Sequence, residues 1–156
     1  MKLFVDTSAW VALNDLTDQH HAVAVEKLAR IRSEKIELIT SDYILDETLT
    51  LIRMRTFHQA AIAFGDILMK SGVASMVSIS DEVRSAAFEL FKKYDDKDLS
   101  FTDCTSFALM KRLKVSTSPA VSATGLPKGS GLNRPNIIRR APGFCQRLPS
   151  YVTGPT

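Results

Sequence analysis

The sequence predicts an α/β protein in which helices cover the faces of a parallel sheet. Between Lys2 and about Lys114, short apolar segments alternate with pairs of segments of helical period, in the order β-α-α-β-α-α-β-α-α. Strands that alternate with helices in this way are typical of parallel sheets. The first strand, Leu3-Phe4-Val5, is apolar throughout, as expected of a strand buried on both faces. One domain with a sizeable core is the natural organisation for 156 residues.

The first elements follow from short-range signals. Residues 9–13 are predicted to form a short helix after the first strand, and a second helix begins at Thr17 or Asp18. It carries apolar residues at helical spacing as far as Ile31. The segment "ELIT", residues 37–40, is the second strand.

Serine residues mark the starts of later helices. Ser41 is expected to cap a third helix, and a fourth covers the apolar residues from 57 to 68. Residues 73–80 alternate as a third strand, and Ser80 caps the helix that follows. After the polar loop "DDKD", residues 100–113 form the last helix.

Composition limits the class of protein. Hydrophobic residues at 45% and charged residues at 24% are ordinary for a soluble globular protein. No apolar run approaches the length of a membrane span, and the N-terminus shows no secretory signal. The two cysteines, Cys104 and Cys145, provide neither a disulfide framework nor a paired-cysteine zinc spacing. We therefore expect a cytoplasmic protein.

The charge and composition change near Val115. All 17 acidic residues and 12 of the 20 basic residues lie within the first 103 positions, which gives that part a net charge of −5. The last 53 residues carry eight basic residues, no acid and all six prolines. This composition predicts a domain over residues 1–115 and an irregular basic tail over 116–156, which replaces the last strand of the domain.

Carboxylates stand at three points from which a cluster is expected to form. Asp6 ends the first strand, Glu47 lies in the third helix on a stripe with Tyr43, and Asp103 lies in the first turn of the last helix, after Asp98. In a parallel α/β layer these points gather at one edge of the sheet. Clustered carboxylates repel one another, and a divalent cation offsets that cost. Magnesium with such ligands suits the hydrolysis of phosphate esters.

Each acid also has a purely structural interpretation. Asp6 is a good cap for the helix behind it, and "SFTD" fits a capping box between Ser100 and Asp103. Glu47 fits an exposed helix acid, and Asp98 fits a solvated loop acid. Singly, each structural interpretation is preferred, but the order and context of the acids together favour a site.

The segments "FVDTSAW", the helix with Glu47 and "DLSFTDCTSFALMKRL" resemble the PIN-domain family, and within it the VapC-type toxin ribonucleases. The match covers about residues 2–114. The resemblance implies a three-layer α/β/α fold with a central parallel sheet. It also implies a Mg2+- or Mn2+-dependent endoribonuclease that acts as the toxin of a toxin–antitoxin pair. The partners then expected are an RNA substrate, a cognate antitoxin that fills an acidic groove, and a second copy in a homodimer.

The resemblance also assigns roles to individual residues. Asp6, Glu47 and Asp103 match the three metal-binding acids, Asp98 matches a position that is often acidic, and Thr7 matches a supporting hydroxyl. The hydroxyls of Thr7 and Ser8 are expected to compensate the charge of Asp6.

One departure from the family leaves alternatives open. PIN domains usually carry a further acid after a fourth strand, and no acid follows Asp103 here. A weak or inactive PIN-like module that binds antitoxin or RNA without cleaving is therefore an alternative. A third is a non-enzymatic α/β domain whose basic tail contacts nucleic acid by charge alone.

Overall fold

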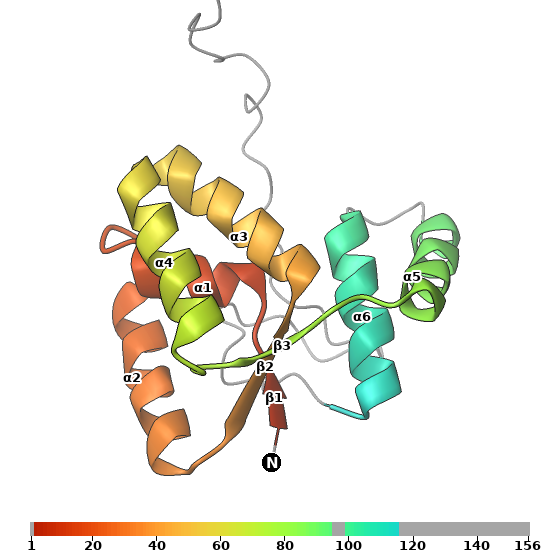
Figure 1. Ribbon diagram of the computed structural model, residues 1–156, viewed down its shortest axis with the longest axis horizontal. Helices are drawn as coiled ribbons and strands as arrows, with labels where there is room; N and C mark the ends of the chain where they lie inside the picture. Colours follow the sequence, from red (N-terminus) through yellow and green to blue (C-terminus); the bar gives the residue numbers. More distant parts are fainter. Residues whose placement is uncertain (1, 95–98, 116–156) are drawn as a thin grey trace, which may run out of the picture.

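The computed structural model describes residues 2–94 and 99–115, which form three layers, helices on both sides of a parallel sheet (Figure 1). The predicted α/β/α fold and the order of its elements are confirmed. No helix in this part of the chain is long and apolar enough to cross a membrane. In chain order the elements are β1 (Lys2–Phe4), α1 (Thr7–Asn14), α2 (His21–Ser33), β2 (Glu37–Ser41), α3 (Asp42–Arg55), α4 (His58–Lys70), β3 (Ser75–Val77), α5 (Asp81–Lys93) and α6 (Phe101–Leu113). The predicted irregular tail, residues 116–156, lies outside the described residues.

The sheet brings the starts of several helices to one edge. Its strand order is β1-β2-β3, all parallel, with Leu3 opposite Leu38 and Ile39 opposite Ser75. β3 is shorter than the predicted strand over 73–80, because it pairs with only three residues of β2. Because the strands are parallel, α1, α3 and α5 all begin near their carboxyl ends.

The helices divide between the two faces of the sheet. α1 to α4 gather on one side and α5 with α6 on the other (Figure 1). On the first side the Trp10 ring of α1 packs against Phe64 of α4, with centroids 5.8 Å apart. A Cβ on Gly65 would lie 3.3 Å from Leu49 of α3, so glycine allows α3 and α4 to approach closely. α4 ends just before Gly72, whose φ of +66° suits glycine.

The three predicted serine caps are confirmed. Ser41 accepts a hydrogen bond from the backbone of Ile44, and Ser80 accepts one from Val83. Ser100 accepts from the backbone N–H of Asp103 and forms the predicted capping box. Each cap joins residues three apart, so local sequence is sufficient to specify it.

The two helices after the first strand start at other positions than predicted. α1 begins at Thr7 rather than residue 9, because the Asp6 side chain caps it by accepting from Ala9 N–H at 3.0 Å. α2 begins only at His21. Before it, the side chains of Asp15 and Asp18 each accept a bond from the backbone two residues on, and these turns delay the helix.

Two fully buried threonines differ in how their hydroxyls are satisfied. The Thr40 hydroxyl accepts from the Trp10 indole N–H and donates to the carbonyl of Val5. Thr48 of α3 lies between Ile44 and Ile52 in the core-facing stripe of the helix, and its hydroxyl finds no hydrogen-bond partner among the described residues. A buried hydroxyl without a partner lowers stability.

We therefore expect Thr48→Val to stabilise the folded protein by about 1 kcal/mol, because it removes an unpaired polar group while keeping the branched shape. Thr40→Val is the matched control and should destabilise by about 1–3 kcal/mol, because it leaves the indole N–H unpaired. Urea unfolding of both variants measures the difference. A loss of stability in Thr48→Val as large as that in Thr40→Val would contradict this assignment.

Candidate active site

Asp6 lies directly beyond the first strand, at the carboxyl edge of the sheet. Its Oδ1 accepts hydrogen bonds from the Ser8 hydroxyl at 2.9 Å and from the backbone N–H of Ala9 at 3.0 Å. Burial raises the pKa of Asp6 above its usual value, these bonds lower it, and the charge of Glu47 raises it further. Asp6 thus caps α1, as the structural interpretation expects, and its carboxylate also interacts with the charge of Glu47.

Glu47 projects from α3 toward α1. Its Oε2 accepts a hydrogen bond of 2.6 Å from the hydroxyl of Thr7, forty positions earlier in the chain. Glu47 is half-buried, unlike an ordinary exposed helix acid. The expectation that Thr7 compensates the charge of Asp6 is wrong, because the hydroxyl of Thr7 reaches across to α3 instead, while Ser8 does contact Asp6 as expected.

Asp103 lies in the first turn of α6, on the other side of the sheet from α1. Its Oδ2 accepts from both the backbone N–H and the hydroxyl of Ser100, each at 2.7 Å. Burial raises the pKa of Asp103 to about 6, despite the two bonds from Ser100, and the charges of Glu47 and Asp6 raise it as well. Asp103 is thus within electrostatic range of both other acids.

The structure brings Asp6, Glu47 and Asp103 close enough for their charges to interact. One carboxylate oxygen of each accepts hydrogen bonds. The second oxygen of each accepts no hydrogen bond from another residue in the described part of the chain. Within residues 2–94 and 99–115, however, no three Asp, Glu, His or Cys side chains are grouped as a ready-made metal site. The arrangement therefore offers three carboxylate oxygens that do not yet converge on one point.

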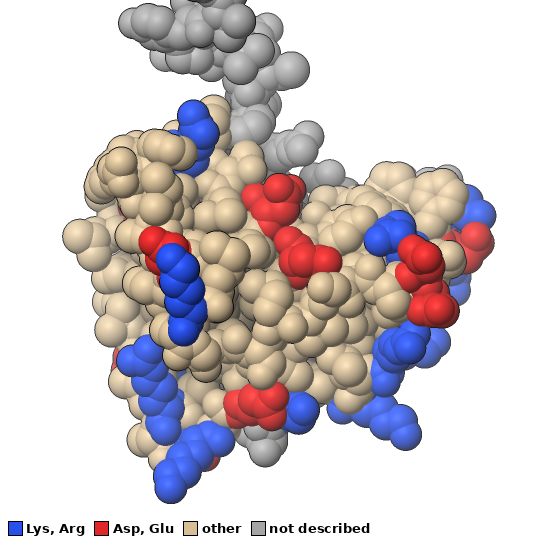
Figure 2. Space-filling model, in the orientation of Figure 1, with Lys and Arg blue, Asp and Glu red and all other residues tan. Residues whose placement is uncertain are grey.

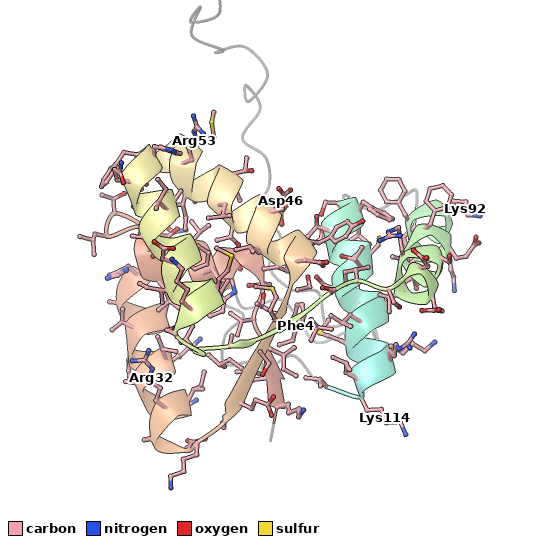
Figure 3. All side chains as sticks on the ribbon, in the orientation of Figure 1. Phe4, Arg32, Asp46, Arg53, Lys92 and Lys114 are labelled. Atoms are coloured by element: carbon pink, nitrogen blue, oxygen red, sulfur yellow. The ribbon has the colours of Figure 1, made fainter. Side chains whose placement is uncertain are left out.

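The surface over the first part of α3 carries acidic side chains (Figure 2). Figure 2 shows acidic side chains near the middle of one face, over α3, and Lys and Arg side chains toward its rim. Asp46 is among the exposed acids there and points to solvent (Figure 3). It precedes Glu47, which turns toward Thr7, so adjacent acids of α3 have different environments.

The remaining predicted site residue, Asp98, lies outside the described residues. Sequence reasoning missed one contact near the site. The sequence places Tyr43 on a stripe with Glu47 but gives no indication of its hydrogen bond to Arg84, forty-one positions away. Helical spacing shows that Tyr43 and Glu47 share a face, and it carries no signal for a partner on another helix.

Comparisons with known proteins agree on one family. The PIN domain family matches residues 3–117. The chain is 36% identical over 110 residues to the 23S rRNA-specific endonuclease VapC20 of Mycobacterium tuberculosis, covering 70% of this chain and 81% of that protein. It is 30% identical over 129 residues to a VapC ribonuclease of Archaeoglobus fulgidus, covering 81% of each.

A solved structure resembles the fold as well. The crystal structure of Mycobacterium tuberculosis VapC20, described as a sarcin–ricin loop cleaving toxin, matches with a TM-score of 0.64 and 32% sequence identity. The match covers 72% of this chain and 84% of that chain. The matched region contains the three acids at the carboxyl edge, and the family predicted from the sequence is confirmed. The chain belongs to the PIN-domain family and is of the VapC type.

Proposed function

We propose that this chain is a divalent-metal-dependent endoribonuclease, the toxin of a toxin–antitoxin pair. The observation that carries the proposal is the set of three carboxylates, Asp6, Glu47 and Asp103, each held through one oxygen while the other accepts no bond from another residue within 2–94 and 99–115. Relatives named as ribonucleases support the reaction class. The same proposal includes a cognate antitoxin that covers the acids, a homodimer, a cytoplasmic location and a role for Asp98 beside the three acids.

The donor set fits hydrated Mg2+ or Mn2+. All three side chains offer oxygen, and Mg2+ keeps several waters, so the acids need not close tightly around it. When bound, such an ion supplies a water of lowered pKa and neutralises charge that develops on the phosphate. The chain's own part is positional. Ser8 and the backbone of Ala9 orient Asp6, Thr7 orients Glu47, and Ser100 orients Asp103.

Removing one carboxylate at a time should abolish cleavage of RNA. Asp6→Asn, Glu47→Gln and Asp103→Asn should each lower the Mg2+-dependent rate by about 100-fold or more, because each removes charge that the cation requires. A sarcin–ricin loop oligonucleotide is the first substrate to assay, since it is the target named for VapC20. Asp46→Asn is the control, because Asp46 is an exposed acid next to Glu47. Equal losses in Asp46→Asn and Glu47→Gln would count against the assignment.

A second candidate is a PIN-like module that binds antitoxin or RNA without cleaving it. One observation favours it, namely that no acid follows Asp103 in the sequence. The assay separates the two, because a binding module retains RNA affinity yet shows no divalent-dependent cleavage in the unaltered chain.

The metal-free protein should lose stability as pH rises, because the pKa values of Asp6 and Asp103 are both raised in the folded state, and the part due to Asp103 can be isolated. The pKa of Asp103 is about 6 when folded and 3.8 in the reference state, so the folded protein favours the protonated form. This stabilisation is fully present below about pH 4 and is lost as pH passes 6, an effect on the order of 3 kcal/mol. Asp103→Asn lacks the titrating group, so the variant should gain stability relative to the parent between pH 4.5 and pH 7.

Urea unfolding at both pH values, in EDTA and in Mn2+, measures this difference. Bound Mn2+ should restore the stability of the parent at pH 7 and leave Asp103→Asn nearly unchanged, by mass action on the folded state. If the capping box were the whole role of Asp103, the variant would instead be less stable at pH 7, and metal would not distinguish the two proteins.

We also propose that residues 1–115 form the nuclease domain and 116–156 a dispensable basic tail. The family match ends at residue 117, which supports this boundary, while the match to the Archaeoglobus fulgidus VapC ribonuclease covers 81% of the chain and so extends into the tail. Val115 packs against the core and donates to the carbonyl of Met110, so truncation belongs after it. The truncated chain should keep its melting temperature and Mn2+ affinity. Unfolding of the truncated chain would show that the tail completes the core and that the boundary is misplaced.

A further inference from the structure

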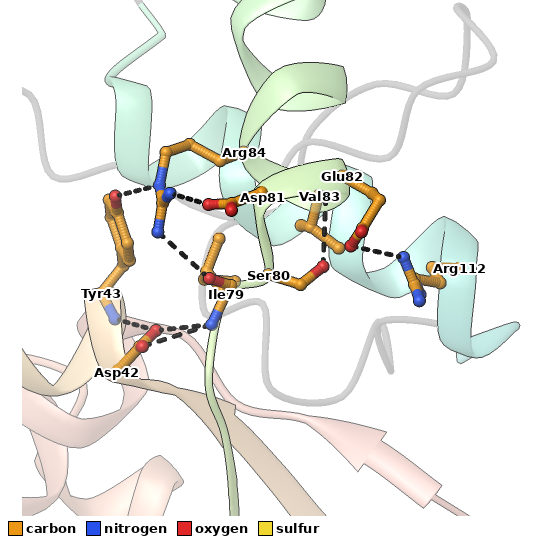
Figure 4. Close-up of polar contacts among 9 residues, drawn as sticks. All are labelled: Asp42, Tyr43, Ile79, Ser80, Asp81, Glu82, Val83, Arg84 and Arg112. Carbon is orange, nitrogen blue, oxygen red and sulfur yellow. Dashed lines mark hydrogen bonds and ion pairs between the residues drawn. The ribbon is translucent and has the colours of Figure 1, made fainter.

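Hydrogen bonds among Asp42, Ile79 and Arg84, here called the polar clamp, fix the start of α3 to the link between β3 and α5 (Figure 4). Both carboxylate oxygens of Asp42 accept from the backbone N–H of Ile79, each at 3.2 Å. Arg84 donates through Nη2 to the carbonyl of Ile79 at 3.3 Å. Side chains from α3 and α5 therefore satisfy both backbone polar groups of Ile79, which ties this link to both helices.

Tyr43 extends the clamp to a third helix. Its hydroxyl accepts from Nε of Arg84 at 3.3 Å, and Arg84 is held in turn by Asp81. Its ring meets Phe101 of α6 edge-on, with centroids 6.1 Å apart and an interplanar angle of 66°. One side chain of α3 thus contacts α5 through its polar end and α6 through its aromatic body.

The position of Tyr43 relates it to two of the site acids. Tyr43 lies one helical turn before Glu47 in α3, and Phe101 lies two residues before Asp103 in α6. α3 and α6 come from opposite faces of the sheet (Figure 1). Since the carboxylates of Glu47 and Asp103 repel each other, the ring contact between Tyr43 and Phe101 near the helix starts helps to hold α3 against α6.

We propose that Tyr43 is a positioning residue of the acid site. Its ring and hydroxyl fix the start of α3 against α5 and α6, and so hold Glu47 and Asp103 in the relative positions from which they bind a divalent cation. This proposal rests on the proposed function. Tyr43 acts through the two helices, since its hydroxyl bonds Arg84 and its ring packs on Phe101.

The direct test is the Mn2+ affinity of the full chain, measured by isothermal titration calorimetry without RNA. Tyr43→Ala should weaken binding about tenfold, at the lower end of effects of residues that support metal ligands. Phe88→Ala is the matched control, because the Phe88 ring also meets Phe101 edge-on, at 6.4 Å, but belongs to α5. Phe88 is 52% exposed, and its loss should leave Mn2+ affinity within about twofold.

A second pair of variants isolates the hydroxyl and tests the proposal even if Tyr43→Ala fails to fold. Tyr43→Phe and Arg84→Met each remove the bond between the two side chains. Because they break the same contact, their effects on Mn2+ affinity should not add in the double variant. Circular dichroism confirms that each variant is folded before titration.

Three outcomes overturn the proposal. The first is equal weakening in Tyr43→Ala and Phe88→Ala, which would show general packing on Phe101. The second is unchanged Mn2+ affinity in Tyr43→Phe when Tyr43→Ala either also keeps its affinity or does not fold. That result would show that Tyr43 has a structural role alone. The third is no Mn2+ binding by the unaltered chain. Only this last outcome also removes the proposed function, so the two failures are distinguishable.

Discussion

Three carboxylates at one edge of the sheet repel one another, and the residues around them are arranged to offset that repulsion. Asp6, Glu47 and Asp103 come from three separate elements, and the pKa values of Asp6 and Asp103 are raised by burial and by the neighbouring acids. Such a cluster costs stability in the folded protein. A hydroxyl holds each carboxylate at a fixed oxygen: Ser8 for Asp6, Thr7 for Glu47 and Ser100 for Asp103.

Helix starts offset part of this cost for two of the acids. Asp6 is the N-cap of α1, and Asp103 lies in the first turn of α6, where backbone N–H groups and the helix dipole favour negative charge. Glu47 lies beyond the first turn of α3, so the dipole helps it little. Instead, the hydroxyl of Thr7 donates a hydrogen bond to the Glu47 carboxylate. Structural and functional interpretations of Asp6 and Asp103 therefore do not compete, since capping uses one oxygen of each.

The parts of the fold that could be predicted are those that local contacts determine. Ser41, Ser80 and Ser100 were identifiable as caps because each bonds a backbone group three residues on. The order of elements followed from the apolar period together with the helix caps. The length of β3 could not be predicted, because it depends on how many residues of β2 it meets.

Contacts across the fold account for the errors near the site. Thr7 was assigned to its sequence neighbour Asp6, whereas it bonds Glu47, forty positions away. The link from Tyr43 to Arg84 spans a similar distance. The sequence places Asp6 at a strand end, Asp103 at a helix start and Glu47 within a helix, but which hydroxyl bonds Glu47 depends on how α1 packs on α3.

α3 contacts helices on both sides of the sheet, because different stripes of its surface pack against different elements. One face places Ile44, Thr48 and Ile52 in the core. The adjacent stripe carries Tyr43 and Glu47, and α3 contacts α1 and α4 on one side of the sheet and α6 on the other. A packed helix interior deforms little, so movement at the start of α3 would be transmitted along it to Glu47. For this reason the contacts of Asp42 and Tyr43 influence the position of Glu47, although neither residue is hydrogen-bonded to it.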